Sequence, residues 1–278
     1  MIRLASKDYG KAEEALRRLS INTMFVQSVL RECVDGEVYG DRVTEPEAFY
    51  VAHPYGMALL FGKTGSSDFE AGLAKRLTNA DGSRSKAEWL QTEPGAGWDP
   101  VIGSVMQAHH ASLVEAGLPE DGDQAIWKNT RVNFRFDPAK HEASKQTHLH
   151  REHDIVRTTG ELFHRQPGAV VPRFYFRNEE QFVNEGVGFT ALNGGEPAAT
   201  AFSAFRNETK LEIGIEASEG FRGKGYAFAV CSALIDYCLE HGLEPVWSCR
   251  RENDASYRLA QKLGFVPTVT LPYYRLPM

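Results

Sequence analysis

A short glycine-rich segment, Arg222-Gly223-Lys224-Gly225-Tyr226-Ala227, is the part of this sequence best suited to bind a phosphorylated ligand. It follows a strand-like apolar stretch and precedes an apolar helix expected over residues 226–241, which Gly242 would end. Backbone N–H groups at the start of a helix bind phosphate oxygens, and the helix dipole favours negative charge there. Gly223 and Gly225 carry no Cβ, so a pyrophosphate could approach their backbone closely. An ordinary glycine turn is the alternative.

Two carboxylates, Glu212 and Glu216, lie on the strand expected directly before this loop. Because side chains alternate along a strand, Glu212, Gly214 and Glu216 share one face, and the apolar residues of the strand share the other. The apolar face is expected to contact the core. The carboxylates therefore face a common side, either as a site for proton transfer or as two solvated charges on an open surface.

The elements that must position these residues are strands in the second half of the chain. Val132, Phe134 and Phe136 alternate with polar residues, which predicts a half-buried strand ending at Asp137-Pro138. Further strands are expected over residues 186–193, 198–206, 211–216 and 247–249. Residues 119–123 (PEDGD) have the composition of a linker. We therefore expect two domains, 1–125 and 126–278.

The first domain is expected to be α/β or α+β. Helices are predicted over residues 9–19 and 23–33, and extended segments over residues 36–42 and 48–62. Between residues 64 and 123 the apolar spacing is helical, and only the Gly/Pro-rich stretch 93–98 interrupts it. This domain is expected to be accessory to the second one and to help form the pocket for an acceptor substrate.

The bulk composition excludes several classes of protein. The net charge is −6 and no Lys/Arg run exceeds two residues, which argues against binding to nucleic acid or an anionic membrane. The N-terminus is too charged for a signal peptide, and no apolar stretch of about twenty residues could span a bilayer. The four cysteines show no CxxC pairing, so we expect neither disulfides nor structural zinc. A cytoplasmic location is expected.

Two motifs resemble those of the GNAT superfamily of acetyl-coenzyme A-dependent N-acetyltransferases. RGKGYA is similar to its R/Q-x-x-G-x-G/A signature, and residues 253–265 (NDASYRLAQKLGF) resemble its N…A..L..K.GF helix. Residues 172–176, 181–189 and 212–227 resemble, more narrowly, the subfamily that contains the zwittermicin A self-resistance acetyltransferase. The resemblance covers most of residues 131–278. It implies a GNAT fold there, with a mixed central sheet flanked by helices; a degenerate GNAT-like half is one option for the N-terminal domain.

The resemblance also implies the cofactor and its site. Acetyl-coenzyme A would be the cosubstrate, with no metal required. The residues implied to bind it are Ile213, Gly214, Ile215, Arg222, Gly223, Lys224, Gly225, Tyr226, Ala227, Asn253 and Ser256. Backbone groups around residues 213–217 would pair with the pantetheine arm, and one amide would polarise the thioester carbonyl. Glu212 is close to where many GNAT members carry the carboxylate that deprotonates the amine through water; Glu216 is the second choice.

The acid that protonates the leaving thiolate is less well defined by the resemblance. The superfamily commonly has a tyrosine seven residues after the asparagine of the last helix, and here that residue is Ala260. Tyr257, about one turn earlier, is the substitute candidate, ahead of Cys249 and Ser256. A packing role for Tyr257, with water as the proton source, is the alternative. Asn253 is also a good N-cap for this helix.

Two other patterns carry less weight. The run from His148 to His153 contains three histidines, but a second cluster of metal ligands is not apparent. Gly62-Lys63-Thr64 follows a strand-like stretch as in a nucleotide-binding P-loop, but Met57 replaces the required first glycine. We interpret this segment as a hairpin turn.

These observations predict a two-domain N-acetyltransferase that acts on a primary amine of a small molecule by direct transfer in a ternary complex. An amino-containing antibiotic as acceptor is implied by the subfamily resemblance alone. A catalytically silent coenzyme A-binding sensor and a protein N-acetyltransferase are the alternatives. A homodimer remains an option.

Overall fold

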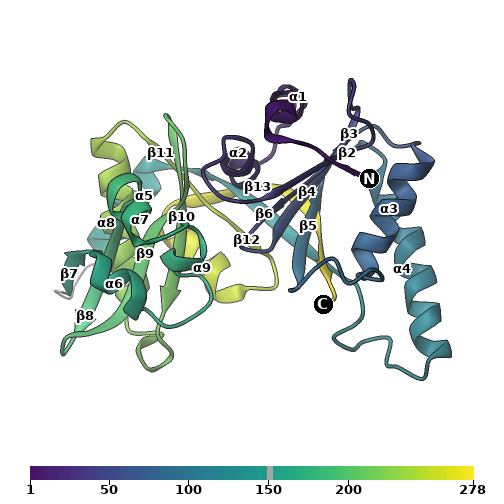
Figure 1. Ribbon diagram of the computed structural model, residues 1–278. Coiled ribbons are helices and arrows are strands. Elements are labelled where there is room, and N and C mark those ends of the chain that lie inside the picture. Colours follow the sequence, from purple (N-terminus) through teal and green to yellow (C-terminus); the bar gives the residue numbers. More distant parts are fainter. Residues whose placement is uncertain (149–152) are drawn as a thin grey trace. The chain divides into compact units, whose positions relative to one another are not determined.

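The computed structural model describes residues 1–148 and 153–278, which form two compact units (Figure 1). One unit contains Met1–Arg131 and Thr270–Met278, and the other contains Val132–Val269. Strands β6 (Trp127–Phe136) and β13 (Phe265–Leu276) each contribute residues to both units. None of the described helices is both long enough and apolar enough to cross a membrane.

The first unit is a mixed sheet with helices on it. Its strands follow the order β1-β2-β3-β4-β5-β13, in which β4 and β5 are parallel and the other neighbours are antiparallel. The elements are β1 (Ile2–Arg3), η1 (Ser6–Asp8), α1 (Tyr9–Leu16), α2 (Met24–Leu30), β2 (Glu37–Gly40), β3 (Ala48–His53), β4 (Met57–Gly62), α3 (Ser67–Thr78), β5 (Glu88–Thr92) and α4 (Trp98–Glu115).

Two sequence predictions in this unit are wrong. Residues 88–92 were expected within a helical stretch, but they form β5. This strand is covered on both faces, so it shows no alternation of apolar and polar residues; its Glu88 is buried because a cation pairs with it. Residues 62–66 do not form a hairpin turn, because they lead from β4 into α3 and β4 then pairs with β5 in parallel.

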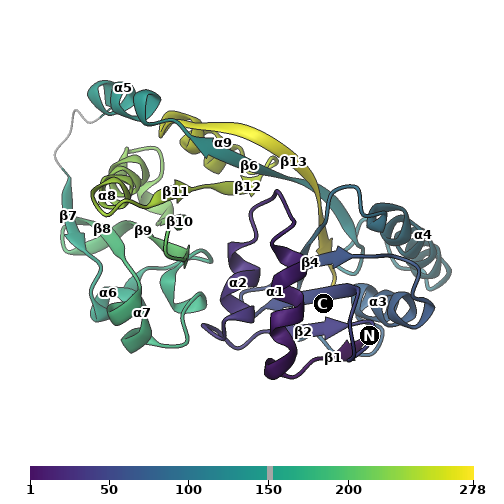
Figure 2. The ribbon, with the colours of Figure 1, turned by 90° about the horizontal axis from the view of Figure 1, so that it is seen from above.

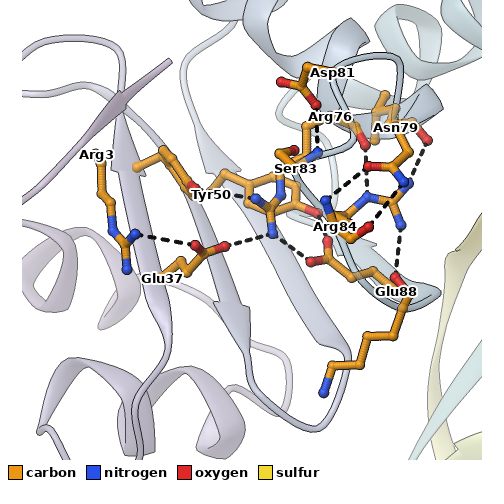
Figure 3. Close-up of polar contacts among 12 residues, drawn as sticks. Arg3, Glu37, Tyr50, Arg76, Asn79, Asp81, Ser83, Arg84 and Glu88 are labelled. Carbon is orange, nitrogen blue, oxygen red and sulfur yellow. Dashed lines mark hydrogen bonds and ion pairs between the residues drawn. The ribbon is translucent and has the colours of Figure 1, made fainter. Parts of the chain in front are cut away.

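A buried ionic cluster fixes α3 to the sheet of the first unit (Figure 3). The Arg76 guanidinium, 5% exposed, lies 2.5 Å from Glu88 Oε1 and 3.0 Å from Glu37 Oε2. Tyr50 Oη donates to the other oxygen of Glu88 at 2.5 Å. Burial raises the pKa of Tyr50 well above its ordinary value, and the neighbouring Glu88 charge raises it further. These contacts compensate the charge of the Glu88 carboxylate, which would otherwise be too costly to bury.

The second unit contains a five-stranded mixed sheet in the order β11-β10-β9-β8-β7. Here β10 and β11 are parallel, and the other pairs are antiparallel. The elements are α5 (Pro138–His148), β7 (Asp154–Arg157), α6 (Gly160–Arg165), η2 (Pro172–Phe174), α7 (Glu179–Glu185), β8 (Gly188–Asn193), β9 (Glu196–Arg206), β10 (Lys210–Ala217), η3 (Glu219–Phe221), α8 (Tyr226–Glu240), β11 (Glu244–Val246), β12 (Ser248–Arg250) and α9 (Asp254–Lys262). The expected mixed sheet flanked by helices is confirmed.

Helices cover both faces of β8, β9 and β10 (Figure 2). Helix α8 packs on the face that carries Leu211 and Ile213, as the period of two along β10 predicts. Helices α6 and α7 lie on the other face, which carries Glu212, Gly214 and Glu216. The two carboxylates are therefore not on an open face of the sheet.

Candidate functional site

The neighbouring strands β10 and β11 diverge beside the glycine loop. Their parallel pairing ends at Glu212 and Val246. Beyond it β10 continues to Ala217 with β9 as its ladder partner, and no strand in the described part of the chain pairs with its other edge. The chain after β11 turns to β6 instead, where Trp247 O accepts a hydrogen bond of 3.1 Å from Phe134 N. The edge of residues 213–217 can thus accept an extended ligand as an added strand.

The glycine loop has the backbone geometry of an anion cradle. Gly223 and Gly225 have φ angles of 74° and 91°, and Gly225 is the N-cap of α8. A Cβ built on Gly223 would meet no heavy atom of the described residues within 4 Å. Arg222 Nε donates to Ala217 O at 3.2 Å and Lys224 Nζ to Gly220 O at 2.8 Å, which holds the loop in shape. The predicted helix is confirmed, and Gly242 follows it with φ 67°.

Glu212 is buried, with 4% of its surface exposed. It pairs across the ladder with Phe205, and a register shift follows directly between Glu212 and Ile213. The ring of Tyr175, which follows η2, packs edge-on against Phe205 at 5.5 Å between centroids. Glu212 therefore lies next to an aromatic pair, Phe205 and Tyr175, at the point where β10 and β11 diverge.

Glu216 has a different environment, although it lies on the same face. Its Oε2 accepts hydrogen bonds from the backbone N–H groups of Ala169 and Val170, at 3.0 and 3.1 Å. Arg222 lies 3.7 Å from the other oxygen. Gly168, with φ 121°, packs so closely that a Cβ there would lie 2.4 Å from Glu216 Cδ. Glu216 therefore anchors the loop before η2 through one of its carboxylate oxygens.

Buried hydroxyl and amide groups extend this anchor across the sheet. Thr190 Oγ1 lies 2.9 Å from both Thr158 Oγ1 and Thr200 Oγ1, and Thr200 Oγ1 donates to Gln166 Oε1 at 3.0 Å. Gln166 Nε2 donates in turn to Ser218 Oγ at 3.1 Å. Sequence analysis missed this chain of contacts because its members are 10 to 52 residues apart and no local pattern connects them.

The start of α9 carries the remaining candidates. Asn253 Oδ1 accepts from Ser256 N at 3.1 Å, which confirms the predicted N-cap. Ser256 Oγ accepts from Trp247 Nε1 at 3.3 Å. The Tyr257 ring lies against Phe134, 5.4 Å between centroids. Ala260 and Cys249, in contrast, are buried in the core.

The histidine run lies partly outside the described residues, which omit 149–152. His153 is described, and its ring lies 4.5 Å from that of Tyr226 in the first turn of α8. Sequence analysis did not place this histidine beside the glycine loop. Within the described segments, no group of three or more His, Cys, Asp or Glu side chains could hold a metal ion.

The first unit has the same succession of strand, glycine-containing loop, helix and parallel strand, in β4, residues 62–66, α3 and β5. Its strands remain joined at the end of β4, however. Glu93 N donates to Leu60 O at 2.9 Å, and Gly62 N donates to Glu93 Oε2 at 2.7 Å. Trp98 Nε1 donates to Gly62 O at 2.9 Å. These bonds occupy the backbone groups that diverging strands would leave to a ligand.

A pocket of about 620 Å³ is lined by residues of the first unit. Its walls include Lys11, Arg18, Glu47, Lys63 and Glu93. Glu47 pairs with Lys63, and Glu93 holds the backbone of residue 62 as described above. The pocket thus combines apolar walls with charged groups that are already bonded within the unit, and the glycine loop of residues 222–227 is not among its walls.

Comparison with known proteins gives a consistent result. The model of the family described as GNAT acetyltransferase matches residues 17–274. A Bacillus subtilis (strain 168) protein described as an uncharacterised N-acetyltransferase, YdfB, is 27% identical over 250 residues, which cover 88% of this chain and 87% of that protein.

Solved structures resemble the fold over nearly the whole chain. A GCN5-related N-acetyltransferase-like protein from Streptococcus suis 89/1591 superposes with a TM-score of 0.70 at 19% identity, covering 98% of this chain and 99% of that one. A tandem GNAT protein of the clavulanic acid biosynthesis pathway gives a TM-score of 0.57 at 11% identity, covering 99% and 97%. At these identities the likeness concerns the fold alone.

Proposed function

Because this chain belongs to the GNAT acetyltransferase family, we propose that it transfers the acetyl group of acetyl-coenzyme A to a primary amine of a small molecule, by direct transfer in a ternary complex. The observation that carries the proposal is the divergence of β10 from β11 directly before a glycine cradle. The first feature offers a free strand edge to a pantetheine arm, and the second offers N–H groups to a pyrophosphate. Both belong to the second unit.

In this proposal the cofactor extends along residues 213–217, with its pyrophosphate on Gly223 and Gly225. The implied ligand set of Ile213, Gly214, Ile215 and the loop is contiguous along β10, η3 and the start of α8. Asn253 and Ser256 stand at the start of α9, which follows the diverging β12. Asn253 and Ser256 would contact the pantetheine arm on the side away from β10.

The proposed reaction is a direct acyl transfer from sulfur to nitrogen. The neutral amine nitrogen attacks the thioester carbonyl carbon, a C–N bond forms, and the C–S bond breaks. A backbone N–H at the edge of β10 polarises the carbonyl oxygen, and Glu212 receives the amine proton through water. The departing thiolate takes its proton from Tyr257 or from water. Glu212 is preferred to Glu216 as the base in this proposal because the backbone of residues 169 and 170 binds one oxygen of the Glu216 carboxylate and Arg222 lies 3.7 Å from the other.

The acceptor class rests on the resemblance of residues 172–176, 181–189 and 212–227 to the zwittermicin A resistance subfamily. An amino-containing antibiotic or metabolite is therefore the proposed acceptor. The buried position of Glu212 opposite Phe205, on which the Tyr175 ring packs, suits a compact amine whose apolar part contacts an aromatic surface.

A second candidate function is a catalytically silent coenzyme A-binding sensor. It is favoured by one specific observation: the side chain at the usual tyrosine position is that of Ala260, and this residue is fully buried. A sensor needs the cradle and the strand edge, but it needs neither a base nor an acid.

Turnover distinguishes the two functions. The protein is incubated with acetyl-coenzyme A and a panel of aminoglycosides, polyamines, amino sugars and peptide amines, and the released thiol is measured. We expect release with at least one small amine. Binding of acetyl-coenzyme A without thiol release from any amine would favour the sensor, whereas turnover confined to peptides would favour a protein N-acetyltransferase.

A variant of the proposed base tests the mechanism with the amine found in that screen. Glu212→Gln should lower the rate most at acidic pH, where the amine most needs deprotonation. Glu240→Gln, at the exposed end of α8, is the matched control and should leave the profile unchanged. An identical pH profile in Glu212→Gln would refute the assignment.

A further inference from the structure

His153 reaches the glycine cradle from a different element of the fold. It immediately precedes β7, about seventy residues before the loop in sequence. Apart from chain neighbours, its Nε2 is the one heavy atom of the described residues within 4 Å of a Cβ built on Gly225, at 3.5 Å. The imidazole edge therefore borders the space that the missing side chain leaves.

The surface under the imidazole is fixed. Its ring packs on Tyr226, with an interplanar angle of 47°. Tyr226 Oη accepts a hydrogen bond of 2.6 Å from Asn193 Nδ2, and the Phe221 ring packs edge-on against the same tyrosine at 5.7 Å. Residues from β8, η3 and α8 thus hold the platform on which the histidine lies.

We propose that His153 is a cofactor-binding residue, whose Nε2–H donates a hydrogen bond to the pyrophosphate of coenzyme A. This inference rests on the proposed function, because it needs the pyrophosphate on the cradle of Gly223 and Gly225. Imidazole donates from Nε2 both as the cation and as the corresponding neutral tautomer, so the contact does not require a particular charge. A hydrogen bond to a phosphate oxygen is stronger than a neutral one because its acceptor is charged.

The position suits the pyrophosphate and not the pantetheine arm. The arm would follow the edge of residues 213–217, whereas His153 lies at Gly225 and Tyr226, where the N–H groups of α8 begin. The contact would join β7, at one edge of the sheet, to the start of α8.

The test compares ligands that differ in the pyrophosphate. Binding of coenzyme A, 3′-dephospho-coenzyme A and pantetheine is measured by calorimetry for the wild type, His153→Ala and His153→Gln. We expect His153→Ala to weaken both pyrophosphate-containing ligands about tenfold and to leave pantetheine unchanged. His153→Gln should recover part of the loss, because its amide nitrogen can donate from a similar distance. His241→Ala, at the opposite end of α8, is the control and should change none of the three.

The possible failures are distinguishable. If the wild type binds coenzyme A and both His153 variants bind it within twofold of the wild type, the inference is wrong and the proposed function stands. An equal loss for all three ligands would mean that His153 only supports the fold of the site, which also overturns it. If the wild type binds none of them, the proposed function itself fails. Thermal unfolding shows whether His153→Ala or His153→Gln has failed to fold. The affinities of the variant that folds then test the inference.

Discussion

Replacing Gly225 tests the cradle most directly, because the consequences for folding and for binding can be separated. Its φ of 91° lies in the left-handed region, where a side chain costs about 1–2 kcal/mol. The space itself is open, since a Cβ there would lie 3.5 Å from His153 Nε2, an ordinary contact distance. Gly225→Ala should therefore fold and lose about 1–2 kcal/mol of stability.

The effect on binding should depend on charge. The carboxylate that Gly225→Glu introduces would stand beside the bound pyrophosphate, and two like charges 4 Å apart near a protein surface repel by about 4 kcal/mol at an effective dielectric constant of about 20. Solvent screening reduces this value for the exposed loop, and we expect Gly225→Glu to weaken coenzyme A at least about 100-fold. Gly225→Ala, which only places a methyl group against the phosphate, should have a smaller effect.

Calorimetry with coenzyme A and chemical denaturation measure the two quantities. Gly220→Ala is the matched control, because Gly220 lies in η3 next to the loop and has no left-handed φ. Apart from its chain neighbours, no heavy atom of the described residues lies within 4 Å of its Cβ position. It should leave both affinity and stability unchanged. The assignment of the loop is refuted if Gly225→Glu is folded and binds coenzyme A as tightly as the wild type.

Three further outcomes follow from the first unit. Calorimetry should give one coenzyme A per chain, since Glu93 occupies the backbone of Gly62; two equivalents would contradict this explanation. Burial lowers the pKa of His53 to about 3, so that acidification below the unfolded-state value of about 6.5 protonates the unfolded chain first and stability falls. At pH 5 this loss is about 2 kcal/mol. His53→Asn should remove this loss of stability, while its amide oxygen still accepts a hydrogen bond from Tyr55 N. If urea titrations show equal acid sensitivity for the wild type and His53→Asn, the assignment of a buried neutral histidine is wrong. Arg76→Met should cost about 3–5 kcal/mol of unfolding free energy because it leaves a buried carboxylate unpaired; a loss under about 1 kcal/mol would show that the cluster is unimportant.

Features encoded within a few residues could be predicted from the sequence. The glycine loop, the helix after it and the N-cap at Asn253 each depend on neighbours in the chain, and the structure has all three. The strand β5 could not be recognised in this way. Its burial on both faces removes the alternation that identifies a strand, and the cation that neutralises Glu88 comes from α3.

Contacts between distant segments could not be predicted either. His153 meets the cradle because β7 lies at the far edge of a sheet whose order depends on all five strands. The chain from Thr158 to Ser218 likewise needs β8, β9 and the end of α6 in register. Polar residues of this kind occur throughout the sequence, and only burial makes their pairing necessary.

The two carboxylates of β10 illustrate how far a periodic pattern carries a functional assignment. The pattern correctly places Glu212 and Glu216 on one face, but it gives them equal standing as bases. The covering elements separate them. Glu216 is opposite Thr200, where the loop before η2 brings two backbone N–H groups to its carboxylate. Glu212 is opposite Phe205, beside an aromatic ring and at the last pair that joins β10 to β11. Strands β10 and β11 diverge at Glu212, so a cofactor bound along the free edge of residues 213–217 would have its thioester next to this buried carboxylate. Glu216, in contrast, binds the loop that covers the same face of the sheet.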